Sequence, residues 1–194
     1  MTKIFEIEGF HTCLDSPNRS ALAKQVPFLS HKNDQWLGQG YYFWTEEPYW
    51  AHKWNPRPKY GHPSRQKIVC AFDITLPEEK FLDLLTLKGQ RWIMTASMVL
   101  AEVLKRDASV SEVFYYLLDK RRGNTAFFPY IAVRMRDNRS EGKLPIMKPN
   151  PKSAWQRGET FSFGERHQMC VYQHYTSEPS ATIKFKNFVL ETED

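Results

Sequence analysis

Alternating hydrophobic and polar residues near the N-terminus predict a first β-strand. Residues 3–10 alternate and contain residues that favour strands, so we expect a strand that ends at His11. The segment 15–25 is typical of a short helix, with Asp15 or Ser16 as its N-cap. The chain is therefore expected to begin with a strand followed by a helix.

A second strand and helix are predicted where aromatic residues are concentrated. Residues 36–43 combine two glycines with aromatic residues, which indicates a turn leading into a strand. Thr45 can cap a helix over 46–54. Three prolines and one glycine in residues 55–66 predict a surface loop after this helix.

Helical periodicity dominates the middle of the chain, after a predicted central strand at 67–74 and a short strand or turn at 81–85. Apolar residues recur at helical spacing within 89–105: Trp92, Ala96, Val99, Leu100 and Val103. A second helix follows, with Ser109 or Ser111 as its cap and one apolar face: Val110, Phe114 and Leu117. Two consecutive helices are therefore expected here.

The C-terminal third is predicted to return to strands. Residues 127–135 are apolar, and their pattern leaves strand and helix open. Residues 137–160 are rich in proline, glycine and charge without an apolar period, which predicts a long loop. Strands are expected at 167–173 and 181–190, so the whole pattern predicts an α+β fold.

Length and composition limit the classes of protein to consider. A chain of 194 residues suits one domain over 1–194, and 41% hydrophobic with 14% aromatic content argues against disorder. The N-terminus lacks the apolar core of a signal peptide, and the longest apolar run, Val113–Leu118, is too short for a membrane helix. We therefore expect a cytoplasmic protein without a membrane partner.

Cysteine and histidine spacing gives no sign of a metal site or a disulfide framework. Cys13, Cys70 and Cys170 are odd in number and widely separated, which fits buried, reduced thiols. The six histidines show no zinc-binding spacing, so no metal is expected.

Three fragments carry a resemblance to a known family. They are Gly9-Phe10-His11-Thr12-Cys13, then Leu37-Gly38-Gln39-Gly40-Tyr41-Tyr42-Phe43, and finally His167-Gln168-Met169-Cys170-Val171-Tyr172. Their order and spacing resemble the diphtheria-toxin and poly(ADP-ribose) polymerase branch of the ADP-ribosyltransferase superfamily. The resemblance implies an ADP-ribosyltransferase-like split β-sheet core with flanking helices, and NAD as the substrate.

The resemblance also implies roles for individual residues. His11 takes the position of the histidine that binds the adenosine ribose of NAD, and Tyr42 that of the tyrosine that stacks on nicotinamide. Gln168 falls where the family has its catalytic glutamate. A glutamine can hydrogen-bond a ribose hydroxyl but cannot carry negative charge or take a proton.

Other positions near the motifs match or depart from the family pattern. Gly40 would let the backbone approach the cofactor closely, and Thr12 replaces a glycine whose backbone grips the nicotinamide amide. Trp50 stands where a helix serine is often found. Glu165 can supply the missing carboxylate if the strand register slips. Arg166 stands where some arginine-modifying relatives have a second Glu or Gln, so the resemblance does not extend to that subclass.

The chemistry of NAD cleavage fits these residue types. Breaking the bond between nicotinamide and ribose develops positive charge at the anomeric carbon. A stacked aromatic ring can hold the leaving group, and polar groups on the two riboses can orient the dinucleotide. The same residues have ordinary alternatives: His11 as a structural histidine, residues 41–44 as a buried strand, and Gln168 as an edge residue. Alternation places Tyr42 and Trp44 on one face of the strand and Tyr41 and Phe43 on the other.

Basic residues are concentrated before the last motif. Ten Lys or Arg and two acidic residues lie between Lys120 and Arg157, a net +8 against +5 for the whole chain. Such a run is usually a solvated surface, but in the family this position holds the loop that selects the molecule to be modified. Four residues are therefore expected to bind the acceptor: Trp155, Arg157, Phe161 and Phe163.

The resemblance leads to the functional expectation of an NAD-dependent mono-ADP-ribosyltransferase. We expect a bacterial toxin or phage-defence effector that modifies RNA, another nucleic acid or a protein, with a cognate antitoxin as a further partner. Two alternatives stay open: a non-catalytic module that binds NAD, ADP-ribose or nucleic acid, and an RNA 2′-phosphotransferase.

Overall fold

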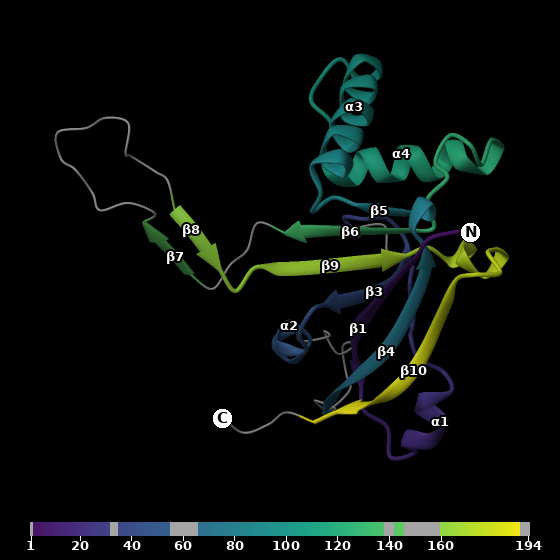
Figure 1. Ribbon diagram of the computed structural model, residues 1–194, viewed down its shortest axis with the longest axis vertical. Helices are drawn as coiled ribbons and strands as arrows, with labels where there is room; N and C mark the ends of the chain where they lie inside the picture. Colours follow the sequence, from purple (N-terminus) through teal and green to yellow (C-terminus); the bar gives the residue numbers. More distant parts are fainter. Residues whose placement is uncertain (1, 32–34, 55–65, 138–141, 146–159, 191–194) are drawn as a thin grey trace, which may run out of the picture.

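A long sheet organises the computed structural model of the chain, which describes residues 2–31, 35–54, 66–137, 142–145 and 160–190. The strands of this sheet are β1 (Ile4–Leu14), β2 (Leu29–Ser30), β3 (Gly40–Thr45), β4 (Lys67–Pro77), β5 (Phe81–Asp83), β6 (Ala132–Asp137), β9 (Arg166–Val171) and β10 (Thr182–Val189). They follow the order β10-β4-β1-β3-β9-β6-β5, with β2 beside β3 (Figure 1). Only the β5–β6 pair is parallel among these described strands. With the helices described below, the predicted α+β fold is confirmed.

The first strand is longer than predicted. It does not end at His11 but continues to Leu14, because β1 stays in antiparallel register with β4 along its whole length, from Ile4 opposite Pro77 to Leu14 opposite Lys67. The predicted central strand at 67–74 is confirmed as β4, which lies between β1 and β10.

The sheet narrows where β1 meets β3. Only two residue pairs are in register there, Gly9 with Thr45 and Phe10 with Trp44. By contrast, eleven pairs join β1 to β4. Two broader halves, β10-β4-β1 and β3-β9-β6-β5, therefore meet at a short seam.

The two short helices differ in detail from the prediction. Helix α1 spans only Arg19–Ala23, and its N-cap is Asn18, whose side chain accepts from the Ala21 amide. Neither Asp15 nor Ser16 caps it, because Asp15 pairs instead with Arg19. Helix α2 spans Tyr49–Lys53 after Pro48.

The sequence predicted Thr45 as the cap of α2, and this prediction is wrong. Thr45 is the last residue of β3 and is buried opposite Gly9, so its side chain is part of the sheet. The chain turns after it at Glu46, which adopts a left-handed conformation with φ of 80°.

The two predicted central helices are present as α3 (Leu87–Leu104) and α4 (Val110–Gly123). Ser109 caps α4 in a capping box with Glu112, as predicted. Of the predicted apolar face, Phe114 and Leu117 are buried, whereas Val110 is 36% exposed. Helix α3 projects away from the sheet (Figure 1), and it contains the residues that were predicted at helical spacing. Two of them, Val99 and Val103, are 52% and 65% exposed, whereas Leu100 is buried.

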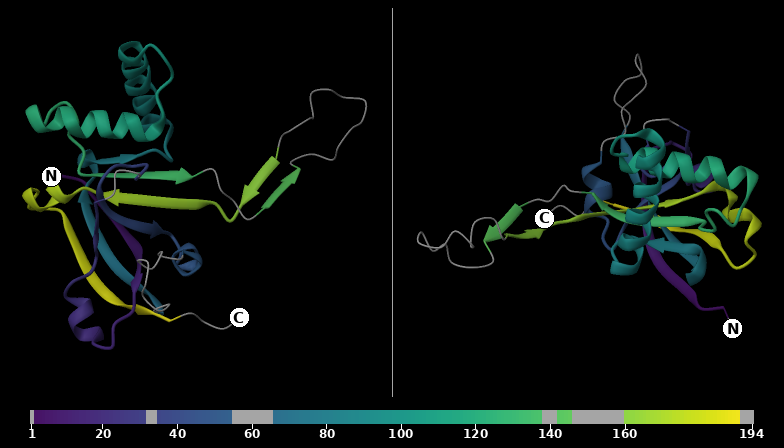
Figure 2. Two further views of the ribbon diagram at one scale, coloured as in Figure 1. Left: turned by 180° about the vertical axis from the view of Figure 1, so that it is seen from behind. Right: turned by 90° about the horizontal axis from the view of Figure 1, so that it is seen from above.

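The predicted long loop at 137–160 contains part of a hairpin. Strands β7 (Gly142–Pro145) and β8 (Thr160–Phe163) pair antiparallel in a separate two-stranded sheet. They extend away from the main sheet in both views of Figure 2. The ambiguous segment 127–135 becomes a strand only from Ala132, and the predicted strands at 167–173 and 181–190 are confirmed as β9 and β10.

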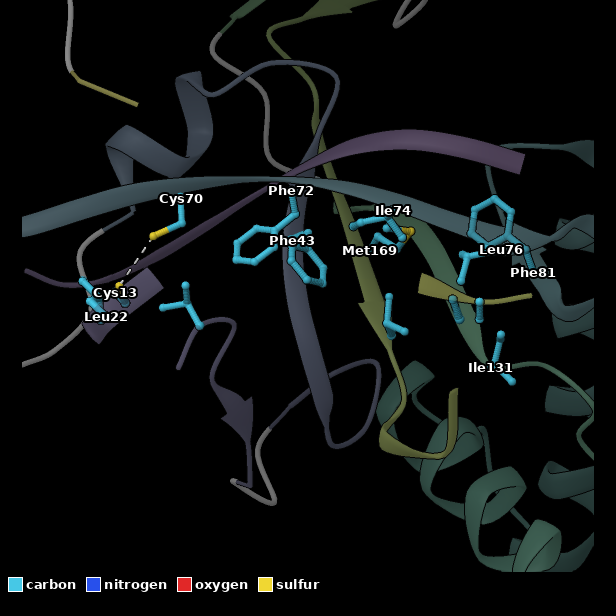
Figure 3. Packing of buried hydrophobic residues seen from close by; sticks show 14 of the residues in the cluster. Cys13, Leu22, Phe43, Cys70, Phe72, Ile74, Leu76, Phe81, Ile131 and Met169 are labelled. Atoms are coloured by element: carbon cyan, nitrogen blue, oxygen red, sulfur yellow. Dashed lines mark hydrogen bonds between the residues drawn. The ribbon is translucent and has the colours of Figure 1, made fainter. Parts of the chain in front are cut away.

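Apolar side chains pack on both faces of the main sheet. One face carries Phe43, Phe72 and Met169, and Figure 3 shows Phe43 and Phe72 side by side, with ring centroids 5.4 Å apart. The sulfurs of Cys13 and Cys70 lie 4.0 Å apart on this face. All three cysteines are buried free thiols, as predicted.

The other face is covered by helices at its two ends. Helix α2 covers Phe10 and Trp44 through Ala51, and α4 covers Val133 and Cys170. None of the helices in the described ranges has the length and hydrophobicity that crossing a lipid bilayer requires.

Candidate functional site

The three motif fragments lie on strands that are neighbours in the sheet. His11 is in β1, Tyr42 in β3 and Gln168 in β9, and the sheet order is β1-β3-β9. Trp44 is opposite Gln168, and Tyr42 is opposite Cys170. Segments more than a hundred residues apart in the chain thus meet beside the seam.

The register divides the motif residues between the two faces. Directly opposed residues of antiparallel strands share a face, so Tyr42, Trp44 and Gln168 lie on the face that α2 and α4 cover. This confirms the predicted grouping of Tyr42 with Trp44. His11 lies on the opposite face, where its ring centroid is 6.1 Å from that of Phe43. The structure therefore brings Tyr42 and Gln168 together but not the ring of His11.

Gln168 is one of two buried polar residues among those described, with 8% of its surface exposed. Its Oε1 accepts a 2.8 Å hydrogen bond from the indole Nε1 of Trp36. An indole N–H can only donate, so the bond directs the amide oxygen toward Trp36 and leaves the two N–H donors of the amide on the other side.

Tyr42 holds the turn that precedes its own strand. Its hydroxyl donates to the backbone oxygen of Gly38 at 2.8 Å and accepts from the amide of Leu37 at 3.1 Å. Gly38 has a φ of +86°, which favours glycine at this turn. Burial raises the pKa of the Tyr42 phenol, so the hydroxyl stays protonated. Its half-buried ring is thereby fixed beside β9.

His11 joins β1 to β3 and to the segment before β2. Its Nδ1 lies 2.9 Å from the backbone oxygen of Tyr42, and its Nε2 accepts from the amide of Phe28 at 3.3 Å. Burial lowers the pKa of His11, while the bond to Tyr42 opposes this shift. The neutral ring therefore carries its proton on Nδ1 and donates it to Tyr42. A ribose hydroxyl must replace one of these bonds to reach the imidazole.

Thr12, Trp50 and Gly40 are engaged with the protein itself. The Thr12 hydroxyl donates to the backbone oxygen of Ala51 at 2.7 Å, which ties α2 to β1. Trp50 Nε1 donates to the backbone oxygen of Glu165 at 3.1 Å. A Cβ added to Gly40 would lie 2.5 Å from the sulfur of Cys170, so this glycine permits close packing of β3 on β9.

Arg166 lies between two tryptophans on the face that carries Gln168. Its guanidinium carbon is 5.1 Å from the ring centroid of Trp44 and 5.2 Å from that of Trp50. Neither this stack nor the role of Trp36 was predicted from the sequence. Residues two apart in a strand point to the same face, and this holds for Tyr42 with Trp44 and for Arg166 with Gln168. That spacing was the signal in the sequence that could have indicated a common face.

Glu165 belongs to a charged cluster near the end of β3. Its carboxylate accepts from Arg136 at 2.7 Å, and its second oxygen is 3.7 Å from Nε2 of His167. His167 Nδ1 is 2.9 Å from a carboxylate oxygen of Glu46. The observed register thus places Gln168 beside Tyr42 and leaves the Glu165 carboxylate paired with Arg136.

Two of the four predicted acceptor residues lie on the hairpin. Trp155 and Arg157 lie outside the described residues, whereas Phe161 and Phe163 belong to β8, opposite Leu144 and Gly142. A cavity of about 430 Å³ lies elsewhere, near the end of α4, with Lys80, Arg121 and Glu178 among its lining residues.

The described motif residues around Gln168 have hydrogen-bonding and aromatic groups that can orient a ligand, but none of them is charged. Tyr42 contributes a half-buried aromatic ring, and Gln168 contributes amide N–H groups, while the ring of Trp44 is buried beside them. None of these side chains titrates near neutral pH. No protein-family model, curated protein or solved structure matches the chain.

Proposed function

We propose that the protein is an NAD-dependent mono-ADP-ribosyltransferase that modifies a nucleic acid or a protein. The proposal rests on the adjacency of β1, β3 and β9, which carry His11, Tyr42 and Gln168. The narrow seam between β1 and β3 also fits the split sheet of the resembling family.

In this proposal Tyr42 and Gln168 hold the nicotinamide half of NAD. The Tyr42 ring stacks on nicotinamide, and the Gln168 amide donates a hydrogen bond to a hydroxyl of the adjoining ribose. The bond between the anomeric carbon and the nicotinamide nitrogen breaks, and its electron pair leaves with neutral nicotinamide. A nucleophile of the acceptor forms the new bond at that carbon, and its proton passes to water.

His11 has a supporting role in this arrangement. Its imidazole donates to the backbone oxygen of Tyr42, so it positions the strand that carries the stacking ring. Binding of the adenosine ribose by His11 requires the longer bond, from the Phe28 amide at 3.3 Å, to open.

A second candidate is a binding module that holds NAD or ADP-ribose without cleaving it. The observation that favours it is the absence of a carboxylate at position 168, together with the use of both His11 nitrogens by backbone groups. Both functions need the Tyr42 ring and differ only in whether nicotinamide is released.

The test is incubation with adenine-labelled NAD and separate pools of RNA, DNA and protein, followed by measurement of label transfer and of free nicotinamide. We expect transfer by the wild type and its loss in Tyr42→Ala. Gln168→Ala and His11→Ala are expected to weaken it. Tyr41→Ala is the matched control, because Tyr41 is the neighbouring residue on the opposite face. NAD binding with neither transfer nor nicotinamide release would favour the binding module.

A further inference from the structure

An uninterrupted series of aromatic rings and cations runs from α2 to the sheet. The rings of Tyr49 and Trp50 are 5.1 Å apart, at an angle of 80°. Arg166 lies between Trp50 and Trp44, and the rings of Trp44 and Trp54 are 5.8 Å apart. Each member therefore touches the next.

Both ends of this series reach solvent. Tyr49 is 37% exposed and Trp54 is 46% exposed, while Trp44 in the middle is buried at 4%. The exposed ring of Trp54 packs on the buried ring of Trp44, and that of Tyr49 packs edge-on against the half-buried Trp50. Rigid, exposed aromatic faces of this kind are what nucleobases stack on in single-stranded complexes.

Lys53 supplies a positive charge beside the exposed ring of Tyr49, and the acidic residues Glu46 and Glu47 lie before the helix. Lys53 places its Nζ 5.3 Å from the ring centroid of Tyr49. The segment 49–54 contains no Asp or Glu, and Arg166 adds a second cation within the series. A ligand that offers both flat rings and negative charge matches this combination, and bases joined by phosphates have both.

The series also reaches the proposed NAD site. Trp44 is directly opposite Gln168 in the sheet, and Arg166 is two residues before Gln168 on the same face. A strand of nucleic acid on α2 would therefore lie next to the residue that we place at the ribose.

We propose that Tyr49, Lys53 and Trp54, supported by Trp44, Trp50 and Arg166, form a stacking surface that binds single-stranded nucleic acid. In naming this ligand as the acceptor, the inference rests on the proposed transferase function. The stacking surface does not include Phe161 and Phe163 of β8, which were predicted to bind the acceptor.

The test measures binding without NAD, so its result is independent of transferase activity. The probes are fluorescein-labelled RNA and DNA strands of about 12 nucleotides, followed by anisotropy, with duplex RNA as a third probe. We expect Trp54→Ala and Tyr49→Ala each to weaken single-strand binding by about 5- to 100-fold. Trp54→Phe keeps a stacking ring and should retain most of the affinity.

Lys53→Gln separates charge from stacking. Loss of one phosphate contact should lower the slope of log affinity against log salt by about 0.7. Phe127→Ala is the matched control, because Phe127 is 43% exposed, packs on a single ring, that of Tyr116, and lies away from α2. Thermal unfolding of each variant shows that the fold is kept.

Three results would overturn the inference. They are unchanged single-strand binding by both Trp54→Ala and Tyr49→Ala, equal binding of duplex RNA, and full competition by inorganic polyphosphate, which has no bases. A protein ligand whose binding depends on the same rings, with no binding of either oligonucleotide, would assign the surface to a different class of partner. Oligonucleotide binding without any ADP-ribose transfer would support the stacking surface and contradict the proposed transferase activity.

Discussion

Trp36 donates a 2.8 Å hydrogen bond from its indole nitrogen to Oε1 of Gln168, across 132 residues of the chain. The bond connects the turn before β3 to β9 and fixes the direction of a buried amide. The same N–H can donate equally well to a carboxylate oxygen, so the site can hold a glutamate at position 168 without losing this contact.

Gln168→Glu is therefore expected to increase nicotinamide release from NAD by about tenfold or more. A carboxylate beside the ribose can stabilise the positive charge that develops at the anomeric carbon, which an amide cannot. The measurement is nicotinamide release at equal NAD and protein concentrations, with the exposed Gln173→Glu as control. A folded Gln168→Glu protein with unchanged release would contradict the assignment of position 168.

Tyr42→Phe and Tyr42→Ala separate the ring from the hydroxyl. The phenylalanine variant removes the hydroxyl that bonds the Leu37 amide and the Gly38 carbonyl, so its free energy of unfolding should fall by about 1–3 kcal/mol. The phenylalanine variant keeps the ring and should still bind NAD. The alanine variant lacks the ring and should not bind NAD. Urea unfolding and NAD titration measure the two effects. Equal loss of NAD binding in both variants would show that the ring is not the binding element.

The stability of the protein should depend on pH through His11. Burial lowers the pKa of His11 below its ordinary value, so the unfolded state binds the proton more readily than the folded state. The stabilising contribution is fully present above about pH 6.5 and falls as the pH drops below it, by at most about 1.4 kcal/mol per pH unit.

His11→Gln should remove this part of the acid sensitivity. Urea unfolding at several values between about pH 5 and pH 8 gives the slope of each protein. His174 also has a pKa lowered by burial, so His174→Gln is the control that removes only its own share. Equal slopes for wild type and His11→Gln would exclude a buried neutral His11.

Two glycine substitutions should act in opposite directions. Gly40→Ala places a Cβ 2.5 Å from the Cys170 sulfur and 2.7 Å from the backbone oxygen of Val171, so β3 and β9 must separate. The expected cost is about 1–3 kcal/mol of unfolding free energy. Gly123→Ala meets nothing within 4 Å at the end of α4 and should be neutral or stabilise by up to about 1 kcal/mol. Matching stabilities for the two variants would contradict close packing at Gly40.

Strong local patterns predicted most of the fold. The strands β4, β9 and β10 and the capped helix α4 follow from alternation, from helical spacing and from Ser109. Burial of an apolar helix face depends on what packs against it, so helical spacing did not indicate that Val99 and Val103 are exposed. The N-cap of α1 was also missed, because Asp15 has an alternative partner in Arg19.

The candidate site was predictable only where its residues follow a short motif. Gly40, Tyr42 and Gln168 stand in such motifs, and their strands are adjacent. Trp36 was missed because its partner is far away in sequence. The left-handed φ of Glu46 has no sequence signal, since such a conformation is unusual for any residue other than glycine.

The short seam has a mechanical consequence for the molecule. Separating β1 from β3 breaks a ladder of two residue pairs, whereas separating β1 from β4 breaks a ladder of eleven pairs. The imidazole of His11 adds a side-chain hydrogen bond across this short seam, to the backbone oxygen of Tyr42. A ligand that reaches His11 by displacing the Phe28 amide leaves this bond across the seam in place, so the two halves of the sheet stay joined while the ligand is bound.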